Sequence, residues 1–205
     1  MISFLVLIFK NFKLSVFERY KIPLKQVWDV CSKPDNTLRY EALLNAFYGK
    51  NILRQCILPL AEVLFVAGFI RFFVFGNQDI ATAVVKSIFD YLSFVVSYGV
   101  LFYLVRWVSV RFFDLQFEER NVSMMVVSLM SVSFVVKLFL SLMPNMFFVN
   151  FFYVYILYLV WVMTEGVIDV PEDKRNKYMV VISFLVIVVP MLIIVLLKRM
   201  VVPNL

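Results

Sequence analysis

The sequence predicts an all-α integral membrane protein: a bundle of five transmembrane helices preceded by an amphipathic region at the membrane interface. Two observations predict this class. Of 205 residues, 63% are hydrophobic and only 17% are charged, with a mean hydropathy of +0.90, whereas a soluble domain is about one quarter charged. The apolar residues also form separate runs of about 20, the length that crosses a hydrocarbon core of about 30 Å.

The amino-terminal part, residues 1–52, is basic and amphipathic, and we expect it on the cytoplasmic side. Residues 1–9 are apolar, but no basic region precedes them and no small-residue cleavage site follows, so we expect a retained interfacial segment instead of a signal peptide. A helix is predicted over residues 20–31, and a second apolar stripe at residues 40–47 follows a turn. Both helices are expected to float on anionic lipid or, alternatively, to pack together as a small cap. The first helix carries a stripe of Leu24, Val27, Trp28 and Cys31.

Five spans form the transmembrane domain, residues 53–197, and residues 198–205 are a short tail. The spans are expected over residues 53–75, 80–105, 122–143, 146–163 and 178–197. Because the connections are short, neighbouring spans should pack as antiparallel hairpins.

The distribution of Lys and Arg predicts the orientation. Nine lie at or before Arg54, and the second and fourth connections carry further clusters, whereas the opposite side has Arg71, Lys198 and Arg199. The amino terminus should therefore be cytoplasmic and the carboxyl terminus across the membrane. The two cysteines, Cys31 and Cys56, fall on the cytoplasmic side, so no disulfide is expected.

The composition disfavours two classes of function. The basic residues, which give a net charge of +6, flank apolar runs and do not form a patch on a soluble scaffold, so no nucleic-acid partner is expected. The chain has no histidine, and its two cysteines are far apart in sequence, so an imidazole base and the usual zinc sites are missing. We therefore expect a protein that is not an enzyme and that carries no cofactor or metal.

Charges inside the spans are the sharpest local signal, because an unpaired charge in hydrocarbon costs at least about 2.5 kcal/mol. Four such residues were found: Glu62, Lys86, Asp90 and Lys137. At about 1.5 Å per residue, Glu62 and Asp90 share one depth, and we predict a single polar cluster among the first three spans. The cluster could fix helix register by mutual neutralisation, relay protons or ions through the carboxylates, or hold a lipid headgroup at the lysines.

The end of the chain resembles the Yip family, five-span membrane proteins named for interacting with Ypt and Rab GTPases. The likeness rests on a Tyr-x-x-Tyr-Leu span at Tyr155 and Tyr158, a Pro-Glu-Asp-Lys-Arg loop at 171–175, and Tyr178 opening the last span. The likeness is specific in sequence over residues 155–178, whereas over residues 20–197 only the architecture agrees. The Asp-Leu-Tyr-Gly-Pro signature and the long polar tail of eukaryotic members are absent, so GTPase binding is not carried over. The resemblance implies a bacterial-type member in the cytoplasmic, or inner, membrane.

The loop of this motif also has a physical interpretation. If Pro171, Glu172 and Asp173 begin the last helix, the acids favour its positive end, and Lys174 and Arg175 reach anionic headgroups. A solvated stop-transfer loop and a docking site for a cytosolic partner are both open. The aromatic fourth span, with Tyr155, Tyr158 and Trp161, could bind lipid or a partner helix, or could simply face lipid.

Two functions follow from the sequence. The first is a non-enzymatic scaffold or membrane-organising protein of Yip type, whose partners are the lipid bilayer and, as alternatives, a second copy or another membrane protein. The second is a subunit of a small transporter or channel that uses the intramembrane charges. A water-filled path to the four charges would favour transport, and direct packing would favour the scaffold.

Overall fold

The computed structural model describes residues 19–32, 52–143, 147–166, 168 and 170–201. All regular structure in these residues is helical, and four of the helices are long and apolar enough to cross a membrane. This confirms the all-α prediction, and the four long apolar helices are compatible with a multi-pass membrane protein. The second predicted amphipathic stripe, residues 40–47, lies outside the described residues, as do residues 1–18.

The first span is a continuous helix of three segments, with an α-helix between two π-helical turns. It consists of the π-helical η1, Leu53–Ile57, then α4, Leu58–Ile70, and the π-helical η2, Arg71–Phe75. Pro59 occupies the first turn of α4 and has no amide hydrogen to donate to the turn before it. The π-helical winding of that turn is an irregularity of the kind that accommodates such a missing bond.

The second span, α5, is longer than predicted and runs from Ile80 to Phe113. Asp79 caps its start by accepting a hydrogen bond from the Thr82 amide at 3.0 Å. The capping bonds hold the pKa of this carboxyl below its ordinary value. The helix passes through the basic residues predicted to lie in a loop and ends at Asp114, whose left-handed backbone (φ 54°) stops it.

The third span is α6, Glu119–Leu142, and the last span is α8, Glu172–Val201. Glu172 and Asp173 occupy the first turn of α8, as one of the sequence interpretations required, and their charges complement the positive end of its dipole. Both helices begin earlier in the sequence than predicted. Their first turns are charged, so hydropathy did not include them in the spans, yet these turns are helical.

The predicted fourth span, residues 146–163, is not one α-helix. Its first part is a 3-10 helix, η3, Phe147–Val154, and only the second part is α-helical, α7, Tyr155–Gly166. The sequence of η3, FFVNFFYV, explains the difference: aromatic and β-branched side chains lose rotamer freedom in an α-helix, and Asn competes for backbone hydrogen bonds. The described residues therefore contain four long apolar helices and this composite segment.

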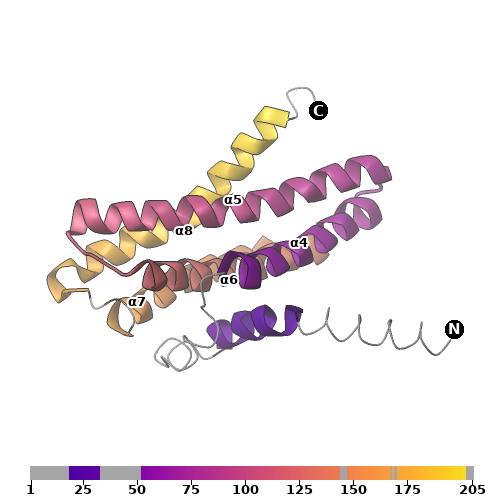
Figure 1. Ribbon diagram of the computed structural model, residues 1–205. Helices are drawn as coiled ribbons and strands as arrows, with labels where there is room; N and C mark the ends of the chain where they lie inside the picture. Colours follow the sequence, from indigo (N-terminus) through magenta and orange to yellow (C-terminus); the bar gives the residue numbers. More distant parts are fainter. Residues whose placement is uncertain (1–18, 33–51, 144–146, 167, 169, 202–205) are drawn as a thin grey trace, which may run out of the picture.

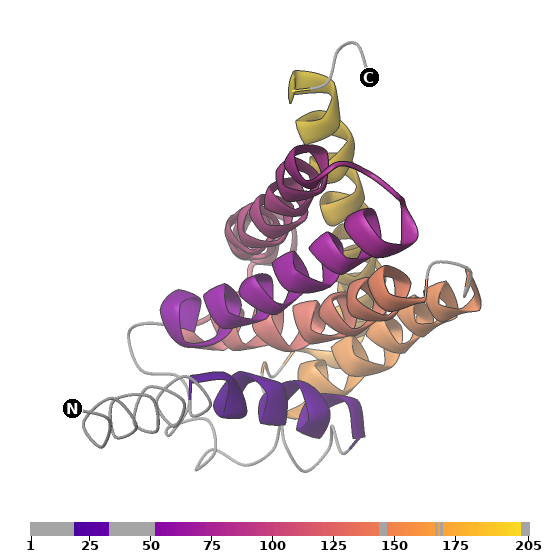
Figure 2. The same ribbon diagram turned by 90° about the vertical axis from the view of Figure 1, so that its right-hand side faces the viewer.

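Successive segments reverse direction, so that the end of α5 and the end of α7 lie at one end of the bundle (Figure 1). The core lies around α6: 67% of its most apolar stretch is buried, against 28% for α5. The carboxyl-terminal part of α8 extends beyond the other helices in both views (Figures 1 and 2). Helix 19–32, in indigo, lies along one side of the bundle, where it contacts α4 and α7.

Candidate functional site

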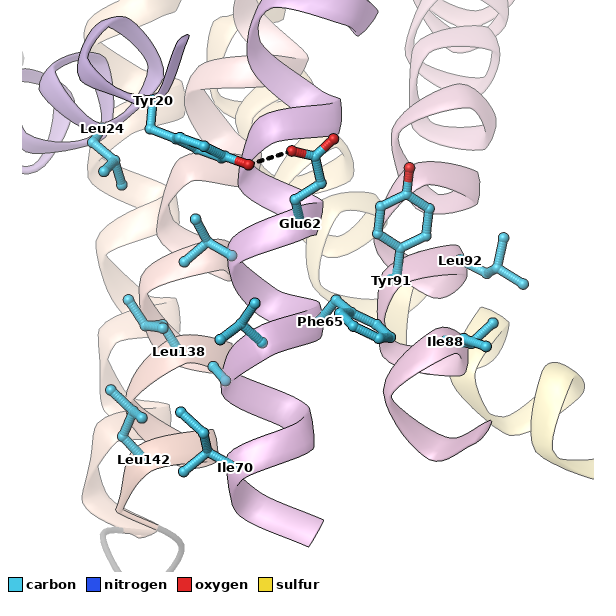
Figure 3. Close-up of a pocket in the computed structure, with 13 residues that line it drawn as sticks. Tyr20, Leu24, Glu62, Phe65, Ile70, Ile88, Tyr91, Leu92, Leu138 and Leu142 are labelled. Carbon is cyan, nitrogen blue, oxygen red and sulfur yellow. Dashed lines mark hydrogen bonds between the residues drawn. The ribbon is translucent and has the colours of Figure 1, made fainter. Parts of the chain in front are cut away.

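Glu62, on the first span, is bound by the amino-terminal helix. The Arg19 guanidinium donates to Glu62 Oε1 at 2.6 Å. The Tyr20 hydroxyl donates to Glu62 Oε2 at 2.5 Å (Figure 3). The hydrogen bond to the Glu62 carboxylate is the main reason that the pKa of Tyr20 is raised, and burial adds to it. An acid within an apolar span is thus paired with a base from a segment more than 40 residues away.

Helix 19–32 is fastened to the bundle at two further points. The buried Cys56 thiol donates to the Gln26 side-chain oxygen at 3.3 Å. At the other end of the helix, the Tyr155 hydroxyl lies 3.2 Å from the Val30 carbonyl oxygen and 3.3 Å from that of Cys31. These contacts join α7 to the last described turn of this helix.

The faces of helix 19–32 differ in part from the prediction. Val27 and Val30 are buried against the bundle, whereas Leu24 and Trp28 are 40% and 71% exposed. The predicted stripe is therefore divided between a side that packs on protein and a side that faces outward. The pKa of the Cys31 thiol is raised by burial. The stripe is divided because the bundle covers only one of its edges. Hydrophobic spacing does not reveal which edge is covered.

A groove of about 970 Å³ opens beside the Glu62 site (Figure 3). Its walls come from helix 19–32, α4, α5 and α6, and they are apolar apart from the Glu62 carboxylate and the hydroxyls of Tyr20 and Tyr91. Among the apolar lining residues are Leu24, Phe65, Val66, Ile70, Ile88 and Leu142. A groove of this composition suits a hydrocarbon chain and offers few ligands to an ion in water.

The other intramembrane charges lie in different settings from Glu62. Lys137 Nζ lies 3.4 Å from the Ser93 hydroxyl, and Asp90 acts on this ammonium electrostatically. Lys86 Nζ lies 5.7 Å from the centre of the Phe72 ring, a cation–π contact. Asp90 of α5 is thus within electrostatic reach of Lys137 on α6, whereas Glu62 has its partners on helix 19–32.

The charged residues of the 171–175 motif connect the helices at the end where α7 meets α8. Lys174 Nζ donates to the Phe113 carbonyl at 2.9 Å, at the carboxyl end of α5, where cations are favoured. Arg175 forms an ion pair with Glu165 of α7 at 3.0 Å. Both cations are therefore engaged with neighbouring helices, which a fully solvated loop would not require.

Tyr178 completes this junction from inside the core. Its ring is fully buried and makes edge-to-face contacts with Phe113 and Phe117, with centroids 5.1 and 6.2 Å apart. Its hydroxyl lies 3.0 Å from that of Ser109 on α5 and 3.9 Å from the Met125 sulfur on α6. The tyrosine that opens the last span in the motif thus holds three helices together.

Three aromatic residues of the fourth segment form a row along α7. The Tyr155 and Tyr158 rings are 5.5 Å apart, and Tyr158 and Trp161 are 6.2 Å apart. Tyr158 and Trp161 are more than one third exposed, while Tyr155 is used by helix 19–32. Only the Tyr155 end of the row therefore has a partner assigned by these contacts.

Arg19 and Tyr20 are the site residues that sequence reasoning missed. They stand at the edge of the predicted helix 20–31, and a partner so distant in sequence has no local signature. The available signal was an unpaired acid in a span together with a basic residue at the start of an amphipathic helix.

Within the described residues, no group of three or more His, Cys, Asp or Glu side chains is placed to hold a metal ion. Comparison of the chain with known family models, curated proteins and solved structures found no match.

Proposed function

We propose that this chain is a non-enzymatic membrane protein of Yip type that acts as a scaffold and organises its membrane through its helix bundle and basic face. The observation that supports the proposal is the setting of the intramembrane charges. Glu62 is engaged by helix 19–32, Lys137 lies beside Ser93 and under the influence of Asp90, and Lys86 lies over an aromatic ring. Charges used in this way fix how helices pack.

The groove gives a second reason to prefer a scaffold to a transporter. Of the four intramembrane charges, its lining includes Glu62 and none of the other three. Its remaining walls are apolar, so it would not replace the hydration shell of an ion with polar ligands. A transport path along the predicted cluster would need polar groups to continue beyond Glu62.

The proposal includes five membrane crossings, with the amino terminus in the cytoplasm and the carboxyl terminus on the opposite side. The composite segment supports the fifth crossing: eight residues of 3-10 helix extend about 16 Å and twelve of α-helix about 18 Å. Their sum, about 34 Å, exceeds a hydrocarbon core of about 30 Å. A reporter fused after Leu205 that is active in the cytoplasm would contradict this topology.

The resemblance to the Yip family further suggests a bacterial cytoplasmic membrane as the location. We propose that the partners are anionic lipid at the cytoplasmic face and either a second copy or another membrane protein. The exposed side of helix 19–32, with Trp28 71% exposed, is the described part of the basic region best placed to meet them.

The experiment that tests the scaffold function is photocrosslinking in native membranes. A photoreactive amino acid replaces Trp28, and in a matched control it replaces Leu192, which is 54% exposed on the projecting part of α8. We expect a discrete protein adduct from position 28, identifiable by mass spectrometry, and none from position 192. The scaffold proposal fails if neither position gives an adduct while the purified protein in liposomes conducts ions in a manner that depends on Glu62.

A further inference from the structure

Arg71 and Lys86 lie on either side of the turn between the first two spans and share one aromatic ring. The Arg71 guanidinium carbon lies 5.5 Å from the centre of the Phe72 ring, and Lys86 Nζ lies 5.7 Å from the same centre. The helices that carry them, η2 and α5, are in contact, and both side chains are half-buried. The structure thus gathers two positive charges at one end of the first helical hairpin.

The acids nearest to these cations in sequence are engaged elsewhere. Asp79 caps the start of α5 and is exposed there. Asp90 acts electrostatically on Lys137 of α6. Among the described residues, neither Arg71 nor Lys86 forms an ion pair with a carboxylate. Taken together, these three cations and two acids leave an excess of one positive charge.

The depth of this excess charge indicates which anion can balance it. Lys86 lies six residues after the start of α5, about 9 Å along the helix at 1.5 Å per residue, whereas half of a hydrocarbon core is about 15 Å. An unpaired charge is costly in hydrocarbon, and the long side chains of Lys and Arg extend toward the headgroups. The phosphate of a lipid in the same leaflet is therefore the anion closest to both side chains.

We propose that Arg71 and Lys86 together bind the phosphate of one anionic phospholipid, in the leaflet that contains the α4–α5 turn. A phosphodiester has two unesterified oxygens, so it can accept from the guanidinium and the ammonium at once. The cation–π contacts with Phe72 hold both donors near one position. Because the site already has excess positive charge, a headgroup that carries its own ammonium is disfavoured.

The inference rests on the membrane crossings of the proposed function and extends its lipid partners. In the proposed topology the α4–α5 turn lies opposite the cytoplasm, so this lipid is separate from the anionic lipid proposed at the cytoplasmic face. A phosphate bound at this turn would bridge the first two spans and stabilise their hairpin.

The proposal is tested with purified full-length protein in phosphatidylcholine nanodiscs and no other protein. The probe is phosphatidylglycerol with a photoreactive group in its headgroup, and labelled peptides are mapped by mass spectrometry. The double variant Arg71→Gln/Lys86→Gln removes both cations and retains polar side chains. The matched control, Arg54→Gln/Arg111→Gln, removes the same charge from exposed positions near the other ends of the same two spans. Helical content by circular dichroism shows that both variants fold.

We expect labelling of the wild type at the α4–α5 turn, and labelling about tenfold weaker there in Arg71→Gln/Lys86→Gln, a loss equivalent to about 1.4 kcal/mol. The matched control should retain the labelling of this turn, and so should Lys86→Arg, which keeps the charge. Should the double variant not fold, Arg71→Gln and Lys86→Gln are measured singly, and each should weaken the labelling. Labelling of the turn that depends on neither cation overturns the proposal.

Two further measurements identify the ligand. A phosphatidylcholine probe should label the turn more weakly than phosphatidylglycerol does, and equal labelling overturns the anionic assignment. Excess inorganic phosphate should leave the labelling unchanged, whereas complete competition would identify a free anion as the ligand and overturn the lipid assignment. Because no partner protein is present, failure here leaves the crosslinking test at position 28 unaffected, and the two failures are distinguishable.

Discussion

Replacing Glu62 with Ala should release helix 19–32 from the bundle. The carboxylate accepts from Arg19 at 2.6 Å and from Tyr20 at 2.5 Å. Hydrogen bonds to charged groups contribute about 1.5–3 kcal/mol. Since both Arg19 and Glu62 are partly exposed, at 51% and 31%, we take this range for the whole set and do not add the bonds. The population of undocked helix should then rise about 10- to 150-fold.

Cys56 is a natural reporter of this docking. Its thiol is fully buried and bonded to Gln26 of helix 19–32, so a maleimide reaches it only when the helix lifts away. In a background with Cys31→Ser, Cys56 is the single cysteine of the chain. The rate of maleimide labelling, normalised to that of the denatured protein, follows the open population when opening is fast compared with the chemical reaction.

Two variants control the measurement. Glu62→Gln retains an oxygen acceptor and should raise the labelling rate less than Glu62→Ala. Glu165→Ala breaks an ion pair at the α7–α8 junction and should leave Cys56 protected. If Glu62→Ala labels at the wild-type rate, the Arg19 and Tyr20 contacts do not hold the helix on the bundle.

Three other predictions concern the rest of the fold. Tyr178→Phe should cost about 1 kcal/mol in unfolding free energy, because one buried hydrogen bond is lost, and Tyr178→Ala about 3–5 kcal/mol, because a cavity forms; steric-trap unfolding in bicelles measures both. Because the pKa of Asp79 is lowered, its cap stabilises the fold fully above the ordinary carboxyl pKa, and this stabilisation is lost as the pH falls through the lowered value. Thermal melts between pH 6 and about 2 should show this pH dependence in the wild type and not in Asp79→Asn. Gly68→Leu should destabilise the α4–α5 contact by about 1–3 kcal/mol in the same steric-trap assay, since even a Cβ would lie 3.2 Å from Asp90 Oδ2; wild-type stability would contradict that packing.

The hydrophobicity of the sequence was sufficient to predict the fold class and the position of most spans. Long apolar runs have one solution in lipid, because unpaired backbone groups are too costly there and helices pair them internally. Helix boundaries were less predictable: α5 continues through Arg106 and Arg111 to Phe113, because a helix need not stop where hydrophobicity does. The 3-10 winding of η3 likewise depends on side-chain sterics that a hydropathy average does not contain.

The buried serines of α6 show the same limit at the level of packing. Ser128, Ser131 and Ser133 are buried within the bundle, although none of them is apolar. Serine permits close helix approach in membranes much as glycine and alanine do. Which face of α6 is covered, however, depends on neighbours that the local sequence does not specify.

Composition and hydropathy were enough to predict a helical membrane protein and to locate the charges within its predicted spans. The packing of the helices brings Glu62 to Arg19 and Tyr20. It also brings Tyr155 to the Val30 carbonyl and leaves a groove beside Glu62. The physical reason is that composition and periodicity act along the chain, whereas the partner of a buried charge is chosen by the packing of segments that are distant in sequence.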